Sequence, residues 1–144
     1  MESNKKVSKR LKWLLFFSIL ALAVNPFTVS ASVNDYSLKR FSSQLANVPL
    51  PQKTNRVESY DRVGGITGNG DNCDFKAGIT YETELSEEEI RAYYSGLELR
   101  SAKGQGQVEI GLLFKEVKWK TDNLVYEIYI LDEGHKAGFD IRCT

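Results

Sequence analysis

The residues that could carry out chemistry are few and widely separated in this sequence. His135 is the only histidine, and it lies between Gly134 and Lys136, which is typical of a solvent-exposed turn. No G-x-S-x-G motif, which marks a nucleophilic serine, occurs. A structural zinc site needs four ligands, whereas the chain offers a single histidine and two distant cysteines. The sequence therefore identifies no catalytic residue and no cofactor, and it favours a non-enzymatic protein. Paired carboxylates stay open as the enzymatic alternative, because Asp and Glu are plentiful.

Residues 68–74 have the composition of a binding loop. They lack the lysine of a phosphate-binding loop and the third glycine of a dinucleotide fingerprint. Asn69, Asp71, Asn72 and Asp74 offer oxygen donors that suit calcium, although their spacing departs from the EF-hand pattern. Two interpretations stay open: a weak calcium site at Asp71 and Asp74, or a turn whose residues favour its backbone conformation.

Trp119 is the aromatic residue that the sequence marks as partly exposed, since it lies between two lysines near an expected strand end. Exposed aromatic side chains bind glycan rings or protein partners, whereas an aromatic residue beside a turn more often covers the core. The candidate contact residues are Asn69, Asp71, Asn72 and Trp119. The expected partner is an envelope or secreted protein, a peptide or a glycan.

Cys73 and Cys143 are the only cysteines, and both follow the N-terminal segment described below. An isolated pair in an exported protein predicts one disulfide. The bridge would close a loop of about 70 residues and stabilise the fold by about 4 kcal/mol. Both cysteines share the parity of the apolar residues in the expected strands beside them. We therefore expect the bridge to join neighbouring antiparallel strands.

The first 31 residues have the three parts of an export signal. Five basic residues precede an apolar run at 13–24, and Val29-Ser30-Ala31 provides the small residues of a cleavage site. The run is shorter than the roughly 20 residues that cross a bilayer. We expect removal of 1–31 and a secreted or extracytoplasmic protein. The alternative is an uncleaved anchor, and the membrane is then contacted through this segment alone.

The remaining 113 residues contain 14 basic and 18 acidic residues, a net charge of −4. This length fits a single domain. The acidic balance disfavours a phosphate-binding surface, so we expect no nucleic-acid partner.

A helix over 86–96 is the best-defined element. Ser86 and Glu89 have the spacing of a capping box, and the acidic triplet 87–89 complements the positive end of the helix dipole. Helix capping therefore explains the triplet without a metal site.

Alternating apolar residues predict strands along the rest of the chain. They cover 57–63, 75–81, 108–114, 124–131 and 137–143, with a hairpin turn at 132–134. Residues 32–55 are expected to be a lead-in segment, in which Leu38, Phe41 and Leu45 have the spacing of a short helix. Residues 56–144 are then a single α+β domain, an antiparallel sheet of four or five strands with helix 86–96 packed on one face.

The loop and the helix together carry a resemblance. The loop reads Gly68-Asn69-Gly70-Asp71-Asn72-Cys73-Asp74-Phe75, and the helix reads Leu85-Ser86-Glu87-Glu88-Glu89-Ile90 followed by Tyr93-Tyr94. This arrangement resembles small exported proteins of Gram-positive bacteria with a GNGNG-type loop and an LSxEE…YY helix. The chain departs from their pattern at Asp71 and Cys73. The resemblance implies a cell-envelope or secreted setting and assigns no residue roles.

The sequence therefore predicts a non-enzymatic extracytoplasmic binding domain. A small secreted hydrolase with paired carboxylates, and an inhibitor or immunity protein for an exported enzyme, are the alternatives.

Overall fold

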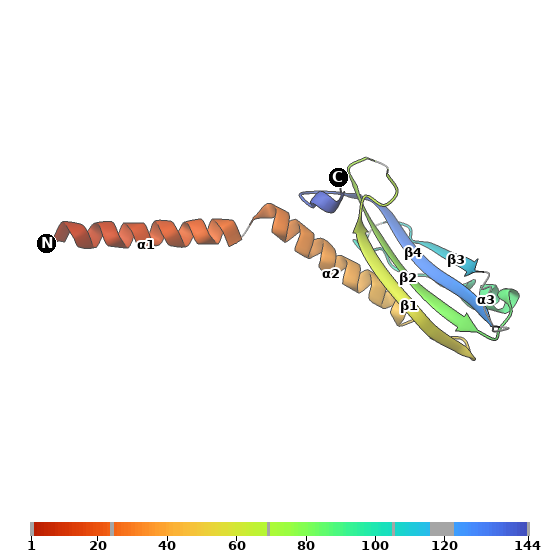
Figure 1. Ribbon diagram of the computed structural model, residues 1–144. Helices are drawn as coiled ribbons and strands as arrows, with labels where there is room; N and C mark the ends of the chain where they lie inside the picture. Colours follow the sequence, from red (N-terminus) through yellow and green to blue (C-terminus); the bar gives the residue numbers. More distant parts are fainter. Residues whose placement is uncertain (1, 24, 69, 105, 116–122, 144) are drawn as a thin grey trace.

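The computed structural model describes residues 2–23, 25–68, 70–104, 106–115 and 123–143 (Figure 1). These described residues form four helical segments and four strands. In chain order they are α1 (Glu2–Ala23), α2 (Pro26–Ala46), β1 (Thr54–Gly64), β2 (Asn72–Thr83), α3 (Glu87–Tyr94), β3 (Glu109–Lys115), β4 (Leu124–Lys136) and the 3₁₀ helix η1 (Ile141–Cys143).

The strands form one open antiparallel sheet in the order β1-β2-β4-β3. The predicted α+β class is confirmed, with four strands. The central pair is β2 and β4, whose register places Ile79 beside Ile128 and Tyr81 beside Tyr126. Because side chains alternate between the two faces of a strand, these apolar residues lie on the same face of the sheet.

Helices α2 and α3 pack on that face. Phe41 and Leu45 of α2, and Ile90 of α3, are buried among the strand residues. The hydroxyl groups of Tyr94 and Tyr126 lie 3.2 Å apart, which ties α3 to β4. Figure 1 shows α2 lying along the sheet, α3 at the far end and α1 projecting away from the domain.

Helix α2 is much longer than the expected short helix. Its N-cap is Asn25, whose side chain accepts a hydrogen bond from the amide of Phe27, and Pro26 occupies the first helical turn. The helix runs through 29–31, the expected cleavage site. The lead-in segment is thus largely a core helix of the domain.

The capping box of α3 is present in both directions. The Ser86 hydroxyl accepts from the amide of Glu89, and the Glu89 carboxylate accepts from the amide of Ser86. The helix ends at Tyr94, slightly before the expected end at 96.

The expected turn at 132–134 and the strand at 137–143 are wrong. β4 continues to Lys136, and two of its residues, Glu133 and Gly134, bulge opposite Asp74 of β2. Gly134 has a φ of 79°, so the turn-like composition marks a β-bulge. The chain then turns at Gly138 and Asp140 into η1, and the backbone amide of Cys143 donates to the carbonyl of Asp140.

No single described helix is long and apolar enough to cross a membrane. Taken together, the two helical stretches Lys9–Ala21 and Pro26–Ala46 have the length and the apolar composition of a membrane span, and they are bent by 41° relative to each other.

Candidate functional site

The residues of the predicted binding loop are not gathered into one site by the described part of the chain. Asn69 and Trp119 lie outside the described residues. Asp71 is exposed, and Asn72 is half-buried at the start of β2. The predicted loop therefore lies at the end of the sheet that carries the disulfide.

Asp74 is fully buried, and its carboxylate holds the loop in place. One oxygen accepts from the amides of Ile66 and Thr67 and from the Thr67 hydroxyl, and the other accepts from the amide of Gly134. Burial raises the pKa of Asp74, but the hydrogen bonds together lower it by more than burial raises it. The net shift of the Asp74 pKa is therefore downward. With hydrogen-bond donors already directed at both oxygens, the geometry accounts for Asp74 without a calcium ion.

Asp140 is the centre of a second buried network, which joins the C-terminal segment to α2. Its oxygens accept from the guanidinium of Arg142 at 2.9 and 2.7 Å and from the side-chain amide of Asn34 at 2.8 Å. Arg142 also pairs with Asp35 at 2.7 Å. The hydrogen bonds from Arg142 hold the pKa of Asp140 far below its ordinary value, although burial opposes them.

Asp132 is the third fully buried carboxylate. It accepts from the Ser101 hydroxyl and the amide of Ala102, which fixes the turn after α3. His135 Nε2 lies 2.8 Å from Asp132 Oδ2 without hydrogen-bond geometry, so the contact is ionic when the imidazole is protonated. The predicted surface histidine is therefore a largely buried partner of Asp132, with 13% of its side chain exposed.

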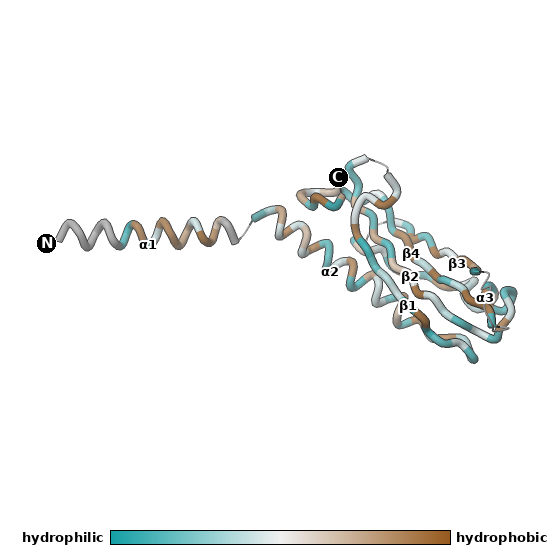
Figure 2. Tube along the Cα trace, in the orientation of Figure 1, coloured by the Kyte–Doolittle hydropathy of each residue, from teal (hydrophilic) through white to brown (hydrophobic). Residues whose placement is uncertain are grey.

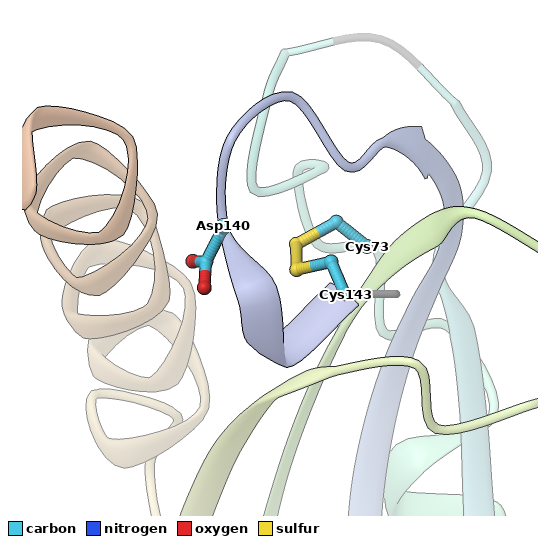
Figure 3. A group of neighbouring side chains, drawn as sticks. All are labelled: Cys73, Asp140 and Cys143. Atoms are coloured by element: carbon cyan, nitrogen blue, oxygen red, sulfur yellow. A yellow bond between two sulfur atoms is a disulfide. The ribbon is translucent and has the colours of Figure 1, made fainter. Parts of the chain in front are cut away.

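Cys73 and Cys143 form the predicted disulfide, with Cα atoms 4.6 Å apart. Cys143 lies in η1 and not in a neighbouring strand, which corrects the expected placement. Figure 3 shows the bridge beside Asp140, whose carboxylate points toward α2. The ligand atoms of these three residues lie within 4.8 Å of one another, but the sulfur atoms are bonded to each other, so the group is a structural bridge. A disulfide is typical of an oxidising compartment outside the cytoplasm.

The buried aspartates of this end thus organise its loops and offer no pair of free carboxylates. Every described carboxyl group with a shifted pKa has it shifted downward, at Asp74, Glu89, Glu127 and Asp140. A general acid needs the opposite shift.

The sheet face opposite the helices is polar, and its groups satisfy one another. The hydroxyl of Tyr60 donates to Glu127 at 2.8 Å, and Lys115 pairs with the same carboxylate at 3.0 Å. Burial and the bond to Glu127 raise the pKa of Tyr60 to about 12. Arg62 lies over the ring of Tyr60, and Lys76 lies over the ring of Tyr129. This face has the cross-strand contacts expected of a stable sheet.

A groove of about 350 Å³ between α2 and strands β1 and β2 is different. Its apolar floor includes Leu45, Ala77 and Ile79. Polar side chains from α2 and β1 form its walls. They are Lys39, Ser42 and Ser43 on the helix, and Arg56, Ser59 and Asp61 on the strand.

The charged side chains of this α2–β1 groove are exposed, and the charge of Arg56 acts on the hydroxyl of Tyr81. None of the ion pairs between described residues includes Lys39, Arg56 or Asp61. Two cations and one carboxylate give the groove a net positive charge in a region, 32–144, whose net charge is −4. The hydroxyls of Ser42 and Ser43 donate to helix carbonyls and keep lone pairs for a ligand.

Sequence reasoning missed this groove because its two walls are distant in the chain. The available signal was in β1, where Ser59 and Asp61 occupy positions whose β2 partners, Ile79 and Ala77, are buried. Polar residues at core-facing positions of a strand indicate that something other than the core lies against them.

Comparison with protein-family models, curated protein sequences and solved structures finds no match to this chain.

Proposed function

We propose that this protein is an extracytoplasmic, non-enzymatic binding domain that holds a small carboxylate-bearing ligand in the α2–β1 groove. The observation that carries the proposal is the gathering of Lys39, Arg56 and Asp61 in one groove without an ion pair to a described residue. Unpaired charges in a concave site with an apolar floor are typical of ligand sites.

The charges of the groove select the ligand class. The guanidinium of Arg56 and the ammonium of Lys39 suit a carboxylate, which arginine can bind through two parallel hydrogen bonds. Asp61 repels a dianion and favours a hydroxyl or amine donor on the same ligand. The volume of about 350 Å³ lies near the small end of ligand sites, so a dipeptide or a sugar acid fits the groove.

The extracytoplasmic placement rests on the disulfide and on the basic and apolar N-terminal segment. The cell-envelope or secreted setting implied by the resemblance agrees with it. Paired-carboxylate hydrolysis is less well supported, because the buried aspartates bind their own loops. No observation favours an inhibitor role.

An NMR titration of the ¹⁵N-labelled full-length chain in lipid nanodiscs tests the proposal. The probes are an acetylated alanyl dipeptide with a free C-terminal carboxylate, the same dipeptide as its amide, and glucuronic acid. We expect saturable shifts of the Ala77–Ile79 amides with a carboxylate probe and none with the amide. Binding of the amide as tightly as the acid, or no binding of either carboxylate probe, would contradict the proposal.

Matched variants place the ligand. Arg56→Gln and Lys39→Gln should each weaken binding about tenfold, because each removes a charged hydrogen bond. Arg62→Gln is the control, since Arg62 lies on the same strand but over Tyr60 on the other face of the sheet. An equal loss in the control would show nonspecific charge attraction.

A further inference from the structure

Exposed apolar side chains continue from α1 into the folded domain. No charged residue occurs from Trp13 to Asn34, a stretch of 22 residues. On α1, apolar residues are exposed around the helix, among them Leu14, Phe17 and Ile19. Figure 2 shows hydrophobic positions recurring along the coloured part of α1. A helix that is apolar on all sides is typical of one surrounded by lipid or by other apolar groups.

The first turns of α2 keep this exposure. Phe27, Val29 and Val33 are each about half exposed, although the helix already contacts the domain here. From Ser37 onward the helix is amphipathic, with Phe41 and Leu45 buried. The apolar surface therefore extends past the break between the helices and reaches the domain itself.

The C-terminal segment adds two residues to the same surface. Phe139 is 57% exposed and Ile141 is 76% exposed, the highest value among the large apolar residues that the structure describes. The ring of Phe139 packs edge-on against Phe27, with centroids 5.6 Å apart. Arg142 donates a hydrogen bond to the carbonyl of Ala31, so the segment is fixed beside α2. We call Phe27, Val29, Val33, Phe139 and Ile141 the apolar patch.

The nearest charges are arranged as at a membrane surface. Asp35, the first charge after the uncharged stretch, pairs with Arg142 at 2.7 Å, and Arg142 also pairs with Asp140. Pairing lowers the cost of placing these charges close to lipid. On the other side of the apolar run lie Lys9, Arg10 and Lys12, the excess of basic residues found on the cytoplasmic side of membrane segments.

We infer that the apolar patch rests in the lipid bilayer that α1 enters, so the C-terminal segment is a second membrane contact of the domain. The occupant is lipid and not a second protein, because the patch is continuous with a helix whose apolar residues face every direction. Retention of residues 1–31 follows from this inference, since the expected cleavage site lies inside α2 and contacts Arg142. The inference rests on the proposed extracytoplasmic placement and is independent of the ligand in the groove.

Tryptophan depth measurements on the full-length chain test this contact. In a Trp13→Phe, Trp119→Phe background, Ile141→Trp and Phe139→Trp each place a reporter on the patch. Leu113→Trp is the control, because Leu113 is a half-exposed apolar residue on β3. Each protein is reconstituted in phosphatidylcholine–phosphatidylglycerol vesicles with and without brominated acyl chains. Retention of the disulfide and an unchanged melting temperature show that each variant is folded.

We expect the reporters at 139 and 141 to lose most of their emission in brominated vesicles and to resist aqueous acrylamide, with the reverse for the control. Acrylamide quenching of both patch reporters would overturn the inference. Resistance to both quenchers would also overturn it, since it indicates a second copy of the chain on the patch. An intact mass of the protein that lacks residues 1–31 would overturn the inference as well. The dipeptide titration in nanodiscs reports the groove separately.

Discussion

The ring of Tyr60 lies across Gly78, the residue that pairs with it on the neighbouring strand, so that a Cβ atom at Gly78 would be 2.6 Å from the ring. Tyr129 covers Gly111 of β3 in the same way. The four residues form one row across the sheet, in which each tyrosine fills the space left by a glycine. The row covers glycines that would otherwise weaken two strands.

Gly78→Ala should destabilise the protein by about 1–3 kcal/mol, because the methyl group must displace the Tyr60 ring and its hydrogen bond to Glu127. Urea unfolding followed by circular dichroism measures the change. Gly96→Ala is the control, since a Cβ atom there meets nothing within 4 Å. Equal midpoints for Gly78→Ala and the parent would show that the ring moves aside freely.

Stability should fall in acid because of Asp74 and Asp140. Their pKa values are lowered by hydrogen bonds in the folded state, whereas an aspartate in the unfolded chain has a pKa of about 3.9. The unfolded state therefore binds more protons below that pH, and the stabilisation present above it is lost as the pH falls. Unfolding free energies measured from pH 6 to pH 2.5 should show this decline. Asp140→Asn should be less stable at pH 6 and should lose less on acidification; a parallel curve would contradict this account.

Removing the disulfide should have a large effect. The bridge joins residues 70 positions apart, and a loop of that size corresponds to about 4 kcal/mol of chain entropy. Cys73→Ser combined with Cys143→Ser should lower the free energy of unfolding by about 2–4 kcal/mol. Chemical reduction of the parent should give the same midpoint as the double variant. A midpoint unchanged by reduction would mean that the polar network alone holds the C-terminal segment.

The capping box of α3 gives a local prediction. Ser86→Ala removes the acceptor for the amide of Glu89 and should cost about 1 kcal/mol. Ser95→Ala, at the other end of the helix, removes only a bond from a hydroxyl to the carbonyl of Ala92 and should change stability little. Equal decreases in the melting temperature of the two variants would show that the N-cap hydrogen bond of Ser86 stabilises α3 no more than the hydroxyl of Ser95 does.

Local patterns predicted the central elements well. Apolar residues occupy every second position of β2 from Phe75 to Tyr81, and α3 has its N-cap Ser86 directly before its first turn and Glu89 within that turn. Both elements were therefore predictable without knowledge of their neighbours. The disulfide was predictable because the chain has only two cysteines.

Features set by distant contacts were missed. The full length of α2 was not predicted, because only two of its 21 residues, Phe41 and Leu45, are buried apolar residues. Ala137, Phe139, Ile141 and Cys143 have the alternate spacing of a strand. In the structure the segment turns beside α2, so Ala137 and Cys143 are buried whereas Phe139 and Ile141 are exposed. The α2–β1 groove is formed by residues of a helix and a strand whose relative position no local pattern specifies.

The strand order also governs when the sheet can assemble as the chain is synthesised. β4 is the last strand along the chain and an inner strand of the sheet, and its pairing with β2 and β3 joins the two halves. Until β4 emerges, β3 has no neighbour in the sheet and β2 has an unpaired edge, which favours intermolecular strand pairing. A chain that emerges from its N-terminus therefore passes through a state with exposed strand edges, and a holding chaperone bound to β2 or β3 would protect these edges until β4 pairs.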